Sequence, residues 1–301
     1  MTGAPTTPGL KDPEVEGDVH IRPVYLAGAD WVGDTAFHPL LALGTRTHHD
    51  DLGNYYVSTV EGRIRVAFIP EQDWDTLWKI AVHTDAFSEP VWVANFSADA
   101  PTEIVTAVTT ELAAMYRADE DSWIHARRPG VLESLAPYAA ARWTWDTRSG
   151  PLGDVAAKSP DGHAQVRYSR TPLTSDESEQ AGQDGRYTLC AGGSHEGWYG
   201  RFSSATPARI LAAAAGAMLD SAPVARYRDF LSPYARRNAT ITPILPPPTP
   251  LDVHRSLAAR TRSAPLALRS TPAARPAVTL AWSTATPATA PAGARITTRS
   301  Q

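Results

Sequence analysis

The strongest constraint on the fold is an internal repeat. Residues 92–105 (WVANFSADAPTEIV) and residues 198–211 (WYGRFSSATPARIL) align without a gap at an offset of 106 positions. They share the frame W-x3-F-S-x3-P-x2-I. Because Trp, Phe, Ser, Pro and Ile all coincide in register, we interpret the two segments as copies of one supersecondary unit.

The repeated frame predicts a strand followed by a helix. The Trp and the Phe of each copy are four residues apart, so they lie on the same face of a strand. Pro101 and Pro207 suit the first helical position, and Thr206 is a suitable N-cap. Apolar residues then follow at helical spacing, namely Ile104, Val105, Val108, Leu112 and Met115 in the first copy and Ile210, Leu211, Ala214 and Met218 in the second. Each helix is therefore expected to bury one face on its sheet.

Each copy also carries a hairpin and one further strand before the Trp strand. Alternation and turn residues predict strands over 55–60, 63–69 and 77–84 in the first copy and over 154–158, 164–169 and 186–191 in the second. Short helices are expected around 39–43 and 131–140. The predicted fold class is α+β, with two tandem repeats, each an antiparallel sheet of about four strands with a C-terminal helix packed on it.

Composition divides the chain into four parts. We expect a flexible leader over 1–18, a first repeat over 19–121, a second repeat over 122–238, and a disordered tail rich in Pro, Ala, Arg and Thr over 239–301. The tail holds 10 of the 26 prolines, and its apolar residues are too scattered to form a core. It also carries seven arginines and one acidic residue, although the net charge of the whole chain is −4.

Several classes of protein are excluded at this stage. The longest apolar run, 210–219, is about half of the ~20 residues that a membrane helix needs. The N-terminus lacks the pattern of a secretory signal, so a cytoplasmic location is expected. A single cysteine, Cys190, forms neither an internal disulfide nor a zinc site of several cysteines.

The order of several short motifs resembles an actinobacterial family known mainly from streptomycetes, the SPDY domain family of unknown function, which usually occurs in two copies. In the first copy the motifs are Tyr25-Leu26-Ala27-Gly28, Asp51-Leu52-Gly53-Asn54, Leu77-Trp78-Lys79-Ile80, Trp92 with Phe96, Pro101-Thr102-Glu103 and Thr109-Thr110-Glu111-Leu112.

The second copy carries the motif that names the family. Ser159-Pro160-Asp161-Gly162 resembles it, with Gly162 where the name has Tyr, and Ala222-Pro223-Val224-Ala225-Arg226 resembles the usual end of a second copy. The first copy departs from the naming motif with Thr59-Val60-Glu61-Gly62. The resemblance covers about residues 20–232, and it implies architecture without a catalytic residue, a cofactor or an activity.

Three features could carry chemistry. His48-His49-Asp50-Asp51 has metal-ligand side chains, but adjacent side chains diverge in an extended segment, so a polar loop is the alternative. Two of the four residues with a distant ligand could still bind a metal ion. Residues 192–197 lack the G-x-S-x-G spacing of a nucleophile elbow and fit a hairpin loop. Cys190 lies in a predicted strand, which indicates packing and not nucleophilic catalysis.

The tryptophans are candidates for stacking or interface contacts. Trp74, Trp78, Trp143 and Trp145 stand out, and Trp143 and Trp145 share a face of an extended segment, which favours a core position. Exposed tryptophans would instead favour partner binding.

These observations leave three functional hypotheses. The first is a non-enzymatic binding or adaptor protein with a protein partner, because the common phosphate, dinucleotide and zinc motifs are absent from the sequence. The alternative is a nucleic-acid-associated protein that uses the basic tail, and the third is an unrecognised hydrolase or nucleotide-binding enzyme. No catalytic residue, metal site or cofactor is predicted, and membrane association is not expected.

Overall fold

The structure is a computed structural model in which the chain divides into two units, residues 1–245 and 246–301. It describes residues 17–30, 34–71, 76–118, 121, 123–124, 127–146, 153–170, 179–181, 183–193, 196–245, 251 and 253–255. The predicted leader and most of the predicted tail lie outside these residues.

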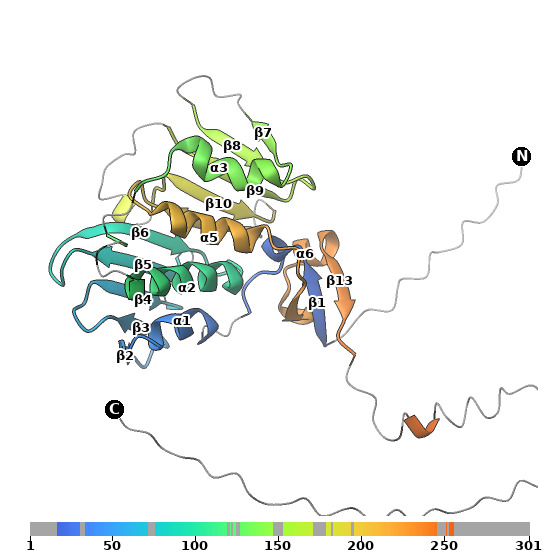
Figure 1. The fold of residues 1–301 in the computed structure, drawn as a ribbon. Helices are drawn as coiled ribbons and strands as arrows, with labels where there is room; N and C mark the ends of the chain where they lie inside the picture. Colours follow the sequence, from blue (N-terminus) through green and yellow to red (C-terminus); the bar gives the residue numbers. More distant parts are fainter. Residues whose placement is uncertain are drawn as a thin grey trace, which may run out of the picture. The chain divides into compact units, whose positions relative to one another are not determined.

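The first unit is built on one antiparallel sheet of ten strands (Figure 1). The first repeat contributes β2 (Arg46–His49), β3 (Tyr55–Ser58), β4 (Ile64–Phe68), β5 (Trp78–His83) and β6 (Pro90–Phe96), and the second contributes β7 (Thr144–Asp146), β8 (Val155–Lys158), β9 (Ala164–Tyr168), β10 (Tyr187–Ala191) and β11 (Trp198–Phe202). Their order is β2-β3-β4-β5-β6-β11-β10-β9-β8-β7. The predicted α+β class and its duplication are confirmed, and the short edge strands β2 and β7 are additions to the four strands expected per repeat.

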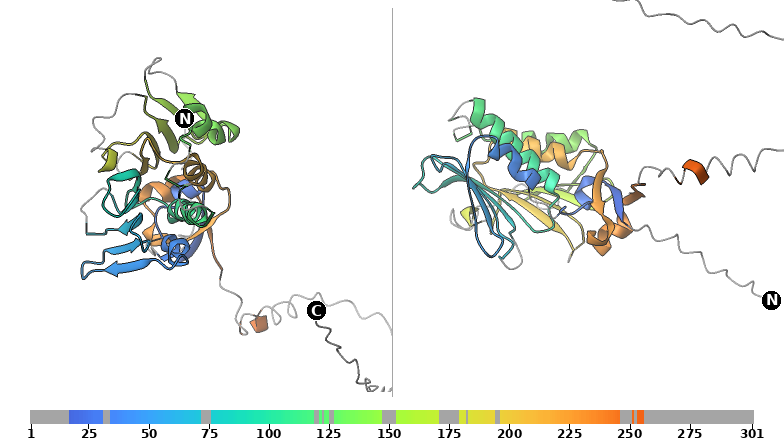
Figure 2. Two further views of the ribbon diagram at one scale, coloured as in Figure 1. Left: turned by 60° about the vertical axis from the view of Figure 1, so that its left-hand side comes forward. Right: turned by 90° about the horizontal axis from the view of Figure 1, so that it is seen from below.

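Within the described part of the chain, four helices cover one face of this sheet (Figures 1 and 2). They are α1 (Asp34–Leu41), α2 (Thr102–Ala118), α3 (Val131–Ala140) and α5 (Ala208–Met218). Every residue of the two predicted apolar stripes on α2 and α5 is buried, and both short helices exist. In α5 the start differs by one residue, because Pro207 keeps an extended ψ of 145° and is itself the N-cap.

The two repeats join edge to edge through the pairing of β6 with β11, called here the seam. Phe96 pairs with Gly200 and Asn95 with Arg201, and the register is symmetric about the second pair. The rings of Phe96 and Phe202 meet edge to face with their centroids 5.5 Å apart. The Phe shared by both repeats therefore packs against its own counterpart.

The shared Ser extends the seam beyond the strand pairing. Ser97 Oγ accepts a hydrogen bond from the Tyr199 N–H at 2.9 Å, and Ser203 Oγ accepts one from the Val93 N–H at 3.0 Å. The backbone N–H groups of Ser97 and Ser203 in turn donate to the carbonyls of Tyr199 and Val93. Each shared Ser thus satisfies a backbone N–H of the other repeat.

The shared Trp also bonds across the repeats. Trp92 Nε1–H donates to the carbonyl of Trp123 at 3.0 Å, and Trp198 Nε1–H donates to the carbonyl of Tyr25 at 2.8 Å. Trp123 precedes α3 of the second repeat, whereas Tyr25 lies in the short helix η1 (Val24–Leu26) that precedes α1 of the first. The shared Trp of each repeat is thus hydrogen-bonded to the segment that precedes the first helix of the other repeat, so the two repeats form one body.

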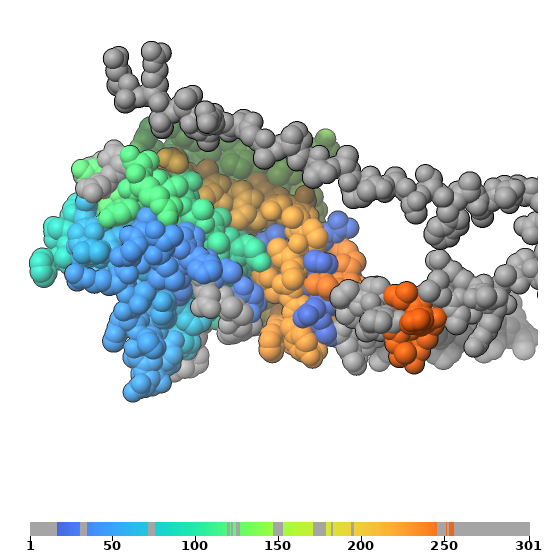
Figure 3. All heavy atoms as spheres, turned by 60° about the horizontal axis from the view of Figure 1, so that its bottom comes forward, coloured from blue at the N-terminus to red at the C-terminus, as the bar shows by residue number. Residues whose placement is uncertain are grey.

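A second, three-stranded sheet has the order β12-β1-β13 and joins the two ends of the unit. Its strands are β1 (Asp18–Arg22), β12 (Val224–Tyr227) and β13 (Thr240–Pro243), with η2 (Arg228–Phe230) and α6 (Pro233–Asn238) between the last two. Figure 3 shows blue atoms of the N-terminal strand among the orange atoms of the C-terminal ones. The predicted start of the tail at residue 239 is wrong, because β13 pairs with β1 and Ile241 packs against Val19 and Ile21.

One buried arginine fastens the small sheet to the main body. The guanidinium of Arg226 on β12 donates to both carboxylate oxygens of Glu103, at 2.8 and 2.5 Å, and to the Gly28 carbonyl at 2.9 Å. Three motifs that carried the family resemblance therefore meet at one ion pair. Among the described residues, no helix has the length and apolarity needed to cross a membrane.

Candidate functional site

The sheet face opposite the four helices, called here the open face, is the candidate site (Figure 2). Residues directly opposite each other on neighbouring strands point to the same side, so the registers define rows across the sheet. The central row, from β7 to β2, is Asp146, Ala156, Arg167, Thr188, Arg201, Asn95, Lys79, Ala67, Tyr56 and His48. The row crosses the seam at the Asn95–Arg201 pair.

Basic residues gather on the open face. Its outward strand positions hold the cations Arg46, Arg65, Lys79, Lys158, Arg167 and Arg201, and the acid Asp146. The cations are distributed unequally between equivalent positions of the two repeats. The equivalent pairs that include a cation are Arg46 and Thr144, Ser58 and Lys158, Arg65 and Gln165, Ala67 and Arg167, Lys79 and Thr188, and Asn95 and Arg201. Each pair has one cation, so the repeats share a fold but present different open faces.

The cations differ in how they are held. Lys158 lies 3.7 Å from Asp146, and Arg167 lies 3.7 Å from Asp154, so both ion pairs are loose and partly exposed. Such pairs contribute little to stability and leave the cations open to other anions.

Two further cations lie on β4 and β5 of the first repeat. The guanidinium of Arg65 donates to the carbonyls of Gly62 and Ala86, which orient it without neutralising its charge. Lys79 has no hydrogen-bond or ion-pair partner among the described residues. Its cross-strand neighbour Asn95 is buried, and Asn95 Oδ1 is unpartnered within the same residues.

A basin of about 500 Å³, the first basin, lies over β3, β4 and β5. Its polar lining consists of Tyr56, Ser58, Arg65, Lys79 and His83, with no carboxylate among the described lining residues, and its floor is apolar. Burial lowers the pKa of His83, and the nearby Arg65 charge adds to this effect, against the Ser88 carbonyl and Asp85. The basin is therefore positive because of Lys79 and Arg65, without a charge from His83 at neutral pH.

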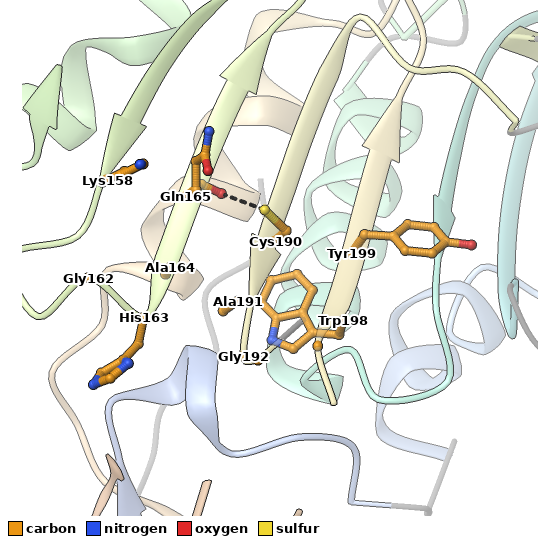
Figure 4. Close-up of a pocket in the computed structure, with 12 residues that line it drawn as sticks. Lys158, Gly162, His163, Ala164, Gln165, Cys190, Ala191, Gly192, Trp198 and Tyr199 are labelled. Carbon is orange, nitrogen blue, oxygen red and sulfur yellow. Dashed lines mark hydrogen bonds between the residues drawn. The ribbon is translucent and has the colours of Figure 1, made fainter. Parts of the chain in front are cut away.

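A second basin of about 520 Å³ occupies the corresponding half of the second repeat (Figure 4). Lys158, Gln165, Cys190 and Tyr199 reach it from β8, β9, β10 and β11. The Cys190 thiol donates to the Gln165 carbonyl at 3.6 Å, and burial raises the pKa of this thiol. Cys190 thus lies on the open face and not among the helix-facing core residues, and its protonated form is favoured.

The residues considered as metal ligands do not converge. His48 and His49 lie on the edge strand β2, where a polar loop was expected, and they stack near Tyr56 and Tyr55 on opposite faces. Asp50 Oδ1 accepts the backbone N–H groups of Leu52 and Asn54, and the Asn54 amide donates to Asp50 Oδ2. Among the described residues, no group of three or more His, Cys, Asp or Glu side chains could hold a metal ion.

The other predicted candidates are placed as follows. Ser194 and His195 of the 192–197 loop and Trp74 lie outside the described residues. Trp78 is buried in the core, and Trp143 packs against Tyr138 with ring centroids 4.9 Å apart. Trp145 is 42% exposed on the edge strand β7.

The family-naming motif forms the tight turn between β8 and β9. Ser159 Oγ accepts the Ala164 N–H and donates to Asp161 Oδ1, while the Tyr25 hydroxyl donates to Asp161 Oδ2 at 2.6 Å. Gly162 has a φ of +77°, a conformation that favours glycine. Burial raises the pKa of Asp161, but the bonds from Ser159, Tyr25 and the His163 N–H outweigh it, and the net shift is downward.

The corresponding turn of the first repeat has the same construction with other residues. Thr59 Oγ1 accepts the Ile64 N–H at 3.1 Å, the Tyr116 hydroxyl donates to Glu61, and Gly62 has a φ of +72°. The hairpin turns of both repeats are therefore closed in the same way, and the naming motif has a structural role in the second repeat. Sequence reasoning missed the open face itself, although the alternation of cations with core residues along β4, β5, β9 and β11 was a usable signal.

A family model described as SPDY, Domain of unknown function (DUF317), matches residues 61–118 and 158–224. The first segment runs from the β3–β4 turn to the end of α2, and the second runs from the end of β8 to the start of β12. No curated protein and no solved structure matches the chain. The chain thus matches the SPDY domain of unknown function in two segments, one in each repeat.

Proposed function

We propose that this chain is a binding protein that holds its partner on the open face of the ten-stranded sheet. The observation that carries the proposal is the concentration of cations on this face, in a chain whose net charge is −4. Folding does not require the cations Lys158 and Arg167, because their loose ion pairs contribute little to stability.

The other distinctive residues of the chain have structural roles. The shared Trp, Phe and Ser form the seam, Arg226 fastens the small sheet, and Asp161 closes a turn. The raised pKa of Cys190 opposes a role as a nucleophile. A binding function therefore accounts for the open face better than the third hypothesis, an unrecognised enzyme.

The experiment is affinity capture from native lysate with the full chain and two charge-reversal variants. The open-face variant carries Lys79→Glu and Arg167→Glu, and the control carries Arg117→Glu on α2 and Arg237→Glu on α6, two exposed positions, which changes the net charge equally. We expect the captured partner to be lost with the open-face variant and retained with the control. A partner that is retained by the open-face variant would contradict the proposal.

Two finer statements belong to the same proposal. A cytoplasmic location and an actinobacterial source remain predictions of the sequence. The use of the basic tail for nucleic-acid association is the alternative, and it concerns residues that lie almost wholly outside the described part of the chain. Capture scored for both protein and nucleic acid tests the two functions together.

A further inference from the structure

The cations of the central row have a regular spacing. Lys79 on β5, Arg201 on β11 and Arg167 on β9 lie in one row, with one strand between each successive pair. Neighbouring strands are about 4.8 Å apart, so successive cations are about 10 Å apart and the three span about 20 Å. A partner that contacts all three is therefore elongated, anionic and oriented across the strands.

An aromatic surface continues the row beyond Lys79. Tyr56 lies two strands further along, and its ring stacks with the exposed His48 at a centroid distance of 6.1 Å and an angle of 24°. On the far side of the seam, Tyr199 carries the Arg201 guanidinium 3.9 Å above its ring centroid. The central row thus carries its cations over the middle strands and two aromatic side chains at the β2–β3 end.

The first basin brings both kinds of group together. Tyr56 and Ser58 line one side, Arg65 and Lys79 contribute positive charge, and the apolar floor includes Ala67 and Ala81. The basin volume of about 500 Å³ lies within the range of ligand sites. Its chemistry suits a unit that has an anionic group and a flat aromatic ring.

We propose that single-stranded nucleic acid binds across the open face along the central row, and this inference rests on the proposed function. Phosphates contact Lys79 and Arg65 in the first basin and Arg167 beyond the seam, while an unpaired base stacks on Tyr56. Paired bases hide their faces inside a duplex, so stacking on a tyrosine favours a single strand. An acidic peptide would satisfy the cations but would offer no base to stack on the aromatic pair of Tyr56 and His48.

The test measures fluorescence anisotropy of a labelled mixed-sequence 20-nucleotide RNA and the matching DNA with the full chain at several salt concentrations. Lys79→Gln is expected to weaken binding about fivefold to tenfold and to reduce the slope of log K against log salt by about 0.7, the value for one lost phosphate contact on a single strand. Tyr56→Ala is expected to weaken binding about tenfold, because one base loses the ring on which it stacks.

Two variants serve as matched controls. Tyr56→Phe keeps the ring and is expected to bind within twofold of the wild type. Arg117→Gln removes one exposed positive charge from the helix-covered side and is expected to have the same small effect. Thermal melts of all four variants identify any loss of binding that comes from unfolding.

Three results would overturn the inference, and they separate it from the proposed function. The inference is wrong if the chain does not bind the oligonucleotides. It is also wrong if neither Lys79→Gln nor Tyr56→Ala changes that binding. If a poly-glutamate peptide or a duplex instead binds in a Lys79-dependent manner, the inference fails while the open face remains the binding face. If neither Lys79→Gln nor the Lys79→Glu and Arg167→Glu variant changes binding of any of these probes, both proposals fail.

Discussion

Replacing the two shared serines of the seam tests whether the repeats form one cooperative body. In Ser203→Ala the Val93 N–H loses its side-chain acceptor at 3.0 Å, and Val93 is 1% exposed. A buried donor left without a partner costs about 1–3 kcal/mol of folding free energy. Ser97→Ala removes the acceptor of the Tyr199 N–H in the same way, and we expect a smaller loss because Tyr199 is only half-buried.

The geometry predicts that the two effects add. Ser97 lies two residues beyond Asn95, and Ser203 lies two residues beyond its partner Arg201 in the opposite direction. Four steps of about 3.4 Å separate the sites by about 14 Å, beyond the distance at which substitutions usually couple. The double variant should therefore lose about 2–5 kcal/mol.

The assay is urea unfolding followed by tryptophan fluorescence and by circular dichroism. We expect a single transition by both probes with an unchanged m value, because Trp92 and Trp198 each bond to the other repeat. Thr144→Ala is the control, since its exposed hydroxyl donates only to the Lys158 carbonyl at 3.5 Å and its loss should change stability by less than about 0.5 kcal/mol. Two separate transitions, or serine variants as stable as this control, would refute the reasoning.

Three further predictions follow from single positions. Arg226→Ala should lower the free energy of unfolding by about 2 kcal/mol, and Arg226→Lys by less, because alanine removes the buried guanidinium that bonds to both Glu103 oxygens and to the Gly28 carbonyl. Equal losses in thermal melts would contradict the role of these hydrogen bonds. Gly200→Ala should destabilise the protein by about 1–3 kcal/mol, because the added Cβ would lie 2.8 Å from the Phe96 ring. Gly216→Ala on α5 is the control, since its Cβ would meet no atom within 4 Å, and it should stabilise the protein slightly. Shifts of the melting temperature with the same sign in both variants would contradict this packing. Burial lowers the pKa of His83, so the unfolded state takes up this proton more readily than the folded state, and stability should fall as the pH falls below the ordinary value of 6.5. Urea midpoints measured between pH 7.5 and 5 should depend less on pH in His83→Gln than in the wild type. An equal pH dependence in the two proteins would contradict this prediction.

Much of the main sheet could be predicted because its signals are local. Period-two alternation indicated the strands, and helical spacing indicated the buried stripes of α2 and α5. The pairing of β6 with β11 could not be predicted from them, since periodicity defines which face of a strand is buried but not which edge finds a partner. The small sheet was missed because β1, β12 and β13 are short and β1 is about 200 residues from its partners.

The candidate site was less predictable than the fold for a related reason. The sequence suggests a site mainly where polar residues cluster, as in His48-His49-Asp50-Asp51. The open face instead consists of residues that are isolated in sequence and become neighbours through strand register. Lys79 and Arg167 are separated by 88 positions and lie in one row. Such a site becomes visible when the cations of every strand are sorted by face.

The duplication itself indicates where function resides. Residues that both repeats share, such as Trp92 and Trp198 or Ser97 and Ser203, bond across the seam, so each one is needed twice for the same structural task. Open-face positions have no such structural task, and there the repeats differ. Where one repeat has a cation, the equivalent position of the other repeat has a neutral residue. If the open face only had to remain soluble, any mixture of charges would serve, and an acidic chain would be expected to place acids there too. The segregation of cations onto this face therefore supports the proposal of an anionic partner that spans both repeats.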